Sequence, residues 1–259
     1  MRRALGVALA LLAGCAAAPQ SEGPKIESGA IVGNATDPRN RARVRTELAS
    51  LYYARGNMNF ALEELRLAVA ADPSFATAHG MFGLVYMGLR ENTLARESFE
   101  RALKLSPDDP DINHNYGWFL CQTGKEAESA EYFMRALRNP LYAAPARSWS
   151  AAGTCALRRG SLREADEYLR RALGIDPNQP AALLQLTQVR YRQGNYGEAR
   201  KLVAQHAKVV DATAESLWLA LRIERRLGQR ATELSYANQL RRRFPQSGEA
   251  QALQRGAYE

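Results

Sequence analysis

The sequence predicts an all-α fold built from six consecutive helix-turn-helix units. Three observations predict it: small residues recur at a regular interval, a glycine follows most of them at a constant distance, and a proline ends most units. The intervals between the recurring positions are 34, 34, 36, 34 and 34 residues. The recurring positions are Ala49, Gly83, Gly117, Gly153, Thr187 and Leu221. A period of this length indicates stacked units that each bury an apolar face against the next.

Each unit carries the signals of two helices joined by a tight turn. A glycine stands seven residues after the recurring position in five units, and Arg90 stands there in the second. A residue without a Cβ atom suits such a turn. Proline ends the second helix because it costs about 3 kcal/mol inside a helix. The turn glycines are Gly56, Gly124, Gly160, Gly194 and Gly228, and the prolines are Pro73, Pro107, Pro140, Pro177 and Pro245.

Each unit resembles a tetratricopeptide repeat, two antiparallel helices in 34 residues. The fourth unit matches best, with Trp149, Gly153, Leu169 and Ala172 in their expected places. The resemblance implies a tetratricopeptide-repeat superhelix of about six units over residues 42–245, followed by a C-terminal tail at 246–259. The expected units are 42–75, 76–109, 110–145, 146–179, 180–213 and 214–245. Two extra residues between units three and four predict a stiff, proline-containing connection at 139–145.

The N-terminal segment predicts export and lipid attachment. A basic start precedes an apolar run of eleven residues, 4–14, which is too short to cross a bilayer and fits a secretory signal. Residues 12–15, Leu-Ala-Gly-Cys, look like a bacterial lipobox, so we expect residues 1–14 to be removed and Cys15 to carry lipid, including palmitate. The alternative is a plain signal peptide with an incidental cysteine. Residues 15–41 lack helical periodicity and predict a flexible tether.

Composition and motifs favour a scaffold over an enzyme. The formal net charge is +8, but basic and acidic residues are interleaved along most of the chain, which predicts a solvated surface rather than a nucleic-acid site. An exported lipoprotein also rarely meets nucleic acid. The sequence holds no His-Glu-x-x-His, Gly-x-Ser-x-Gly, Walker A or Gly-x-Gly-x-x-Gly motif. We therefore expect no catalytic residues, no cofactor and no metal site.

Two cysteines remain beside Cys15. Cys121 and Cys155 lie on the first helices of units three and four, in registers two places apart. Neighbouring helix axes are about 8–10 Å apart, whereas a disulfide needs Cα atoms about 4.4–6.8 Å apart. The small residues on these helices allow that approach, and the expected compartment is oxidising. We expect a disulfide that closes a 34-residue loop, worth about 3.5 kcal/mol in the chain-entropy model; the alternative is two buried thiols.

The first helices of such a stack line a concave groove. Aromatic and methionine side chains in that groove are typical of binding hot spots and adaptable surfaces. The residues expected to line it are Ser50, Tyr53, Leu84, Met87, His114 and Trp118. For Tyr53 and Trp118 the alternative is burial in the core, and for His114 it is packing or solvent exposure. An extended or helical segment of another protein would suit the groove.

The central stretch resembles the PilF/PilW lipoproteins of type IV pilus biogenesis. The shared strings are Asn-His-Asn-Tyr-Gly-Trp-Phe-Leu-Cys at 113–121, Tyr-Phe-x-x-Ala-Leu at 132–137, Asn-Pro-Leu-Tyr at 139–142, Cys155, and Arg-Arg-Ala-Leu at 170–173. The resemblance implies a pilotin, a lipoprotein anchored in the outer membrane and facing the periplasm. It would bind the pilus secretin through its groove and aid secretin localisation and assembly, and we expect it to be monomeric on its own.

The repeats alone leave other functions open. One is pilus stability without direct secretin contact. Another is a general periplasmic scaffold for envelope protein assembly. A third is a cell-wall enzyme or its regulatory subunit, which the missing catalytic residues disfavour.

Overall fold

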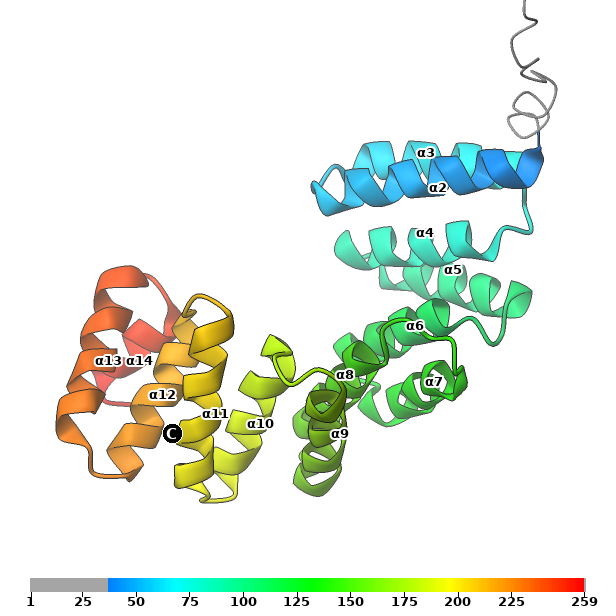
Figure 1. The fold of residues 1–259 in the computed structure, drawn as a ribbon. Helices are drawn as coiled ribbons and strands as arrows, with labels where there is room; N and C mark the ends of the chain where they lie inside the picture. Colours follow the sequence, from blue (N-terminus) through cyan, green and yellow to red (C-terminus); the bar gives the residue numbers. More distant parts are fainter. Residues whose placement is uncertain (1–36, 259) are drawn as a thin grey trace, which may run out of the picture. The chain divides into compact units, whose positions relative to one another are not determined.

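The computed structural model describes residues 37–258, which form thirteen α-helices and no β-strand. In Figure 1 these helices run from α2 in blue to α14 in red. Cys15, the predicted signal segment and most of the predicted tether lie outside the described residues. The helices are α2 (Pro38–Ala54), α3 (Met58–Ala71), α4 (Ala76–Gly88), α5 (Asn92–Leu105), α6 (Pro110–Gln122), α7 (Glu126–Arg138), α8 (Pro145–Arg158), α9 (Leu162–Ile175), α10 (Pro180–Arg192), α11 (Tyr196–Val209), α12 (Ala214–Arg226), α13 (Arg230–Arg243) and α14 (Gly248–Arg255).

Twelve of these helices form six pairs, and each pair packs against the next. Contacts are most extensive within the pairs α2–α3, α4–α5, α6–α7, α8–α9, α10–α11 and α12–α13 (Figure 1). The first helix of each pair also contacts the first helix of the following pair, from α2–α4 to α10–α12. The fold is therefore an all-α tetratricopeptide-repeat superhelix, as the period predicts.

The turn inside each unit passes through the left-handed region of backbone space. The five turn glycines have φ between 69° and 82°, and Arg90 adopts φ 63° at the same place in unit two. A side chain disfavours this conformation by roughly 1–2 kcal/mol. The regular spacing of the glycines therefore reflects the need for a positive φ at each turn. Arg90 adopts the same positive φ at a cost in conformational strain.

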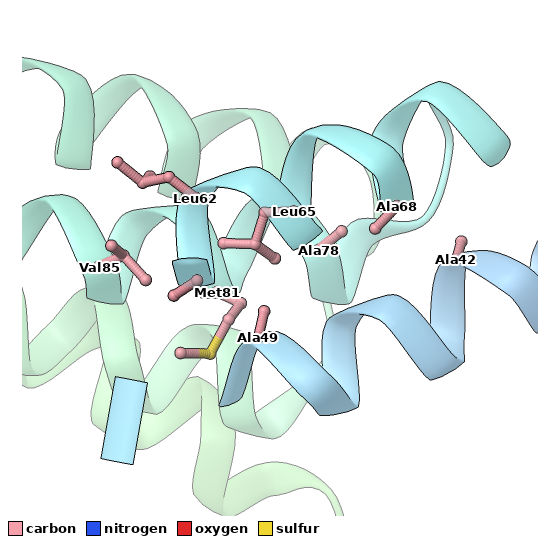
Figure 2. Close-up of a cluster of buried hydrophobic side chains, with 9 residues drawn as sticks. Ala42, Ala49, Leu62, Leu65, Ala68, Ala78, Met81 and Val85 are labelled. Atoms are coloured by element: carbon pink, nitrogen blue, oxygen red, sulfur yellow. The ribbon is translucent and has the colours of Figure 1, made fainter. Parts of the chain in front are cut away.

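The recurring small residues let the two helices of a pair approach closely. A Cβ atom added to Gly83 would lie 2.7 Å from ring atoms of Phe99, and one added to Gly153 would lie 2.5 Å from Cγ of Leu169. Phe99 and Leu169 are fully buried. Figure 2 shows the same arrangement in the first unit, where Ala49 of α2 and Leu65 of α3 share a cluster with Met81 of α4.

One predicted boundary is wrong, and the predicted C-terminal tail contains a helix. Helix α2 begins at Pro38, so residues 38–41 are helical and not part of a tether, and proline is well suited to a first helical turn. The predicted tail contains α14, which contacts α12 and α13. Ser247 caps α14 by accepting the backbone N–H of Ala250, and Gly256 ends it in the left-handed conformation. The buried Leu253 explains the helix, because it covers apolar surface on the last unit.

Candidate functional site

A pocket of about 460 Å³ lies on the first helices of units one to three. Helices α2 and α4 each contribute four residues at helical spacing, in the same register of the repeat. The start of α6 completes the lining. From α2 come Arg43, Thr46, Glu47 and Ser50; from α4, Thr77, Gly80, Met81 and Leu84; from α6 and its cap, Asp109, Asp111, Ile112 and Asn115; and Phe75 precedes α4. The repeat itself therefore builds the pocket.

The buried part of the lining is mostly apolar, with Thr46 as its polar member. Met81 and Ile112 are 8% and 3% exposed, and Phe75 and Leu84 are half-buried. Gly80 lets α4 approach Ile112 of α6 closely, because a Cβ atom there would lie 3.3 Å from Cγ1 of Ile112. Concave sites with an apolar interior and a few polar groups are typical of ligand and peptide recognition.

The rim of the pocket carries an excess of negative charge. It holds the carboxylates of Glu47, Asp109 and Asp111 and one guanidinium, that of Arg43. Arg43 Nη1 lies 2.6 Å from Glu47 Oε1 in an exposed ion pair, which contributes little to stability. Asp109 Oδ1 accepts the backbone N–H of Ile112 at 2.9 Å and caps α6. The rim therefore favours a ligand with basic groups beside an apolar stretch.

Of the six residues predicted for the groove, Ser50 and Leu84 line the pocket. Tyr53 and Met87 do not line it: Tyr53 packs against the core of the first unit, and Met87 packs against the core around Phe99. Tyr53 also approaches the end of α4, where a Cβ on Gly88 would lie 3.5 Å from its ring. Both side chains lie one turn beyond the pocket, where successive units pack together.

His114 does not face a groove, contrary to the prediction. It is 6% exposed and lies between α6 and α8. Its Nε2 accepts a hydrogen bond from Arg147 Nε at 2.8 Å, and its Nδ1 lies 2.7 Å from Ser148 Oγ. Since Arg147 can only donate, the ring proton belongs on Nδ1, which donates to Ser148. Burial and the charge of Arg147 lower the pKa of His114 to about 3, so the ring is neutral and structural.

The loop between α7 and α8 contacts the same cluster. Tyr142 is 7% exposed, and its hydroxyl lies 3.0 Å from Ser148 Oγ. The neighbouring Leu141 is 89% exposed. The inserted residues therefore place one side chain in the core and the next in solvent.

Trp118 is half-buried and belongs to the core rather than to the pocket. It packs against a cluster that contains Cys121, Phe133 and Cys155. Cys121 and Cys155 form a disulfide in the structure, with Cα atoms 5.8 Å apart. Both cysteines are buried, and the bond joins α6 to α8.

Comparisons with known proteins show which proteins this chain resembles. Models described as tetratricopeptide repeat match residues 81–144 and 156–221. Over 256 residues the chain is 30% identical to the type IV pilus assembly protein PilF of Pseudomonas aeruginosa, and the match covers 98% of each protein. The chain belongs to the PilF/PilW family of type IV pilus biogenesis proteins.

Solved structures of the PilF/PilW family share the fold. The crystal structure of PilW, described as a widely conserved type IV pilus biogenesis factor, superposes with a TM-score of 0.77 at 32% identity. The match covers 82% of this chain and 97% of PilW. The structure of Pseudomonas aeruginosa PilF gives a TM-score of 0.77 at 29% identity, covering 85% of this chain and 99% of PilF.

The pocket of this PilF/PilW-family chain includes residues that the sequence analysis missed. Arg43, Glu47, Phe75, Asp111 and Ile112 line it beside the two predicted residues. Most of them could have been predicted from the repeat. On α2 and α4, the pocket is lined by residues that stand six, three and two positions before the recurring residue and one position after it. Within residues 37–258, no group of three or more His, Cys, Asp or Glu could hold a metal ion. No helix in that range is long and apolar enough to cross a membrane.

Proposed function

We propose that this protein is a pilotin-like scaffold for type IV pilus biogenesis. It is attached to the outer membrane through lipid on Cys15, faces the periplasm, and binds the pilus secretin to aid its localisation and assembly. Membership of the PilF/PilW family supports the role in pilus biogenesis. The lipid anchor rests on the Leu-Ala-Gly-Cys string at 12–15. The protein acts by binding and not by catalysis.

One observation carries the proposed binding mode: an apolar pocket with an acidic rim spans three consecutive first helices. A segment of the secretin would place apolar side chains against Met81, Leu84 and Ile112. A basic residue of the segment would lie near Glu47 or Asp111. A volume of about 460 Å³ accommodates a few side chains, which suits a short extended or helical peptide better than a whole domain.

The decisive experiment measures secretin assembly in cells. Outer membranes are run on unheated detergent gels and probed for the detergent-resistant secretin multimer in wild type, in a deletion strain, and in strains that carry single variants. Leu84→Asp places a charge in the pocket, whereas Leu94→Asp places the same charge on α5 at a residue 41% exposed and outside the pocket. We expect the deletion and Leu84→Asp to lose the multimer and Leu94→Asp to keep it.

A second pocket variant separates binding from folding. Leu84 also packs against two core clusters, so Leu84→Asp is checked by circular dichroism. Ser50→Trp fills the pocket from an exposed position and should give the same loss of multimer. A normal multimer with loss of pili would instead indicate a role in pilus stability without secretin contact. Normal multimer and normal pili in the deletion strain would refute the proposed function.

The anchor has its own test. Cys15→Ser removes the proposed lipidation site and should move the protein from the membrane fraction to the soluble periplasmic fraction. Unchanged fractionation with membranes would refute lipid attachment at Cys15 without affecting the pocket assignment.

A further inference from the structure

The first unit has an outer face that no helix among residues 37–258 covers. Within that range α2 and α3 contact only each other and α4, and Figure 1 shows them at one end of the series of pairs. The last unit differs, because α14 packs on α12 and α13 and buries Leu253. A terminal unit of a repeat stack usually needs a polar outer face to stay soluble.

The outer face of unit one is apolar where the repeat makes its contacts between units. Leu51 is 56% exposed, whereas the residues at its position in the other five units are between 0% and 2% exposed. Each of those five packs in a cluster with residues of the preceding unit. They are Val85, Phe119, Cys155, Val189 and Ile223. Leu51 is therefore a contact residue whose partner is missing from the described part of the chain.

The same comparison holds for Val44, and neighbouring side chains extend the face. Val44 is 48% exposed, against 0% to 4% for its equivalents, which are Ala78, Ile112, Ser148, Ala182 and Ser216. The half-buried Leu48 lies between Val44 and Leu51 on one stripe of α2. Tyr52 continues the face to α3, because its ring centroid lies 5.4 Å from that of the exposed Phe60. We call these five residues the end face: Val44, Leu48, Leu51, Tyr52 and Phe60.

Arginines lie at both ends of the apolar stripe of α2. Arg41 precedes Val44 by three residues, and Arg55 follows Leu51 by four, so both share its side of the helix. Together α2, α3 and the residues beside them, 37–71, hold six arginines and four carboxylates, a formal charge of +2. Arg43 pairs with Glu47 and Arg45 with Glu64, but exposed pairs are weak. The face therefore combines apolar side chains with a modest positive charge.

This charge pattern disfavours a second copy of the chain as the occupant. Two copies of α2 that cross antiparallel at Leu48 would bring Arg41 of one copy close to Arg55 of the other. Like charges in contact oppose association. Apolar and aromatic side chains flanked by arginines are instead typical of surfaces that lie in the interfacial layer of an anionic membrane.

We propose that the end face docks on the surface of a membrane that contains anionic phospholipid. Its apolar side chains enter the interfacial layer, and the arginines of α2 contact lipid phosphates. Asp37, where the described chain begins, is only 22 residues after Cys15, so α2 is the helix nearest in sequence to the proposed anchor. That a membrane lies within reach rests on the proposed function, but the affinity of the face for lipid does not. Docking leaves the pocket accessible, because α2 lines the pocket with other residues: Arg43, Thr46, Glu47 and Ser50.

The test is vesicle flotation of the purified mature chain, residues 15–259, carrying Cys15→Ser so that no lipid is attached. The vesicles contain equal amounts of phosphatidylglycerol and phosphatidylethanolamine, and vesicles of phosphatidylcholine are the uncharged comparison. Phe60→Glu is the main variant, because units three to five carry glutamate at this position of the repeat and the fold accepts it. Leu94→Glu is the matched control, since Leu94 is the equivalent residue of unit two and is also exposed.

We expect the chain to float with the anionic vesicles and less with phosphatidylcholine. Phe60→Glu should weaken binding about ten-fold, and Leu94→Glu should have little effect. Leu51→Asp should weaken binding as Phe60→Glu does, with circular dichroism confirming that both variants are folded.

Three results would overturn the proposal. One is a chain that does not float with anionic vesicles, and another is equal weakening by Phe60→Glu and Leu94→Glu. The third is a dimer in light scattering that Phe60→Glu dissolves, without vesicle binding, which would assign the end face to self-association. None of these results affects the anchor, because the assayed chain has no lipid, and fractionation of the Cys15→Ser strain tests that proposal separately.

Discussion

Replacing Gly153 with alanine tests whether close approach of α8 and α9 holds the fourth unit together. The added Cβ atom would lie 2.5 Å from Cγ and 2.8 Å from Cδ2 of Leu169, and 3.3 Å from the backbone nitrogen of Leu169. Carbon atoms in favourable contact are about 3.5–4.0 Å apart, so the added methyl group is roughly 1 Å too close. Leu169 is fully buried and has no open space to enter, so the two helices must separate.

The expected energy combines two opposing terms. Alanine gains about 1 kcal/mol over glycine in a helix interior, whereas overpacking a core costs about 1–3 kcal/mol. Because a backbone atom is among the close contacts, we expect the upper end of that cost and a net loss of about 2 kcal/mol. Gly174→Ala in α9 is the matched control, since nothing lies within 4 Å of its added Cβ. It should raise the free energy of unfolding by up to about 1 kcal/mol.

Urea denaturation followed by circular dichroism compares the two variants with the wild-type chain. The predicted difference between Gly153→Ala and Gly174→Ala is about 3 kcal/mol, from the overpacking and helix-propensity terms together. If Gly153→Ala is as stable as Gly174→Ala, the close contact is not required, and the assignment of the recurring small residues to helix approach fails.

Three other perturbations have expected outcomes. Arg90→Gly should raise the free energy of unfolding by about 1 kcal/mol, because it relieves the left-handed conformation; thermal denaturation checks it, and an unchanged or lower midpoint would contradict it. The double variant Cys121→Ala, Cys155→Ala should lower the free energy of unfolding by about 3.5 kcal/mol through loss of loop closure. Free thiols in protein isolated from the periplasm would refute the disulfide. The folded-state pKa of His114 is about 3 against an ordinary 6.5. Between these pH values the unfolded chain therefore binds a proton that the folded chain does not. Stability should fall by up to about 1.4 kcal/mol per pH unit as pH drops through this window, and His114→Asn should flatten that slope while His79→Asn should not.

The sequence predicts the repeat well because each signal reflects a local physical requirement. A positive φ favours glycine at the turn, and a close helix contact requires a small residue such as Gly83. Arg90 shows how a local signal can weaken while the fold persists: the left-handed turn forms there without glycine. One favourable residue is missing, but the neighbouring helices still pack around Phe99.

The groove was predicted less well because groove exposure depends on neighbours that are distant in the sequence. His114 shares its register with Thr46 and Gly80, which line the pocket. It does not line that pocket; its ring nitrogens instead bond to Arg147 and Ser148 of the next first helix. Helix α14 escaped prediction for a related reason. It lies in the segment predicted only as a C-terminal tail, and its contacts are with α12 and α13.

The inserted residues between units three and four explain why interactions gather on α6 and α8. Recurring positions elsewhere lie 34 residues apart, but Gly117 and Gly153 lie 36 apart. A disulfide between cysteines 34 residues apart therefore joins positions two residues out of register, an offset of about 3 Å along a helix axis. The disulfide, the contacts of His114 with Arg147 and Ser148, and the hydrogen bond from Arg158 to Gln122 at 3.1 Å all join α6 to α8. The one break in the period is thus the place where covalent and polar links supplement the packing of small and large residues.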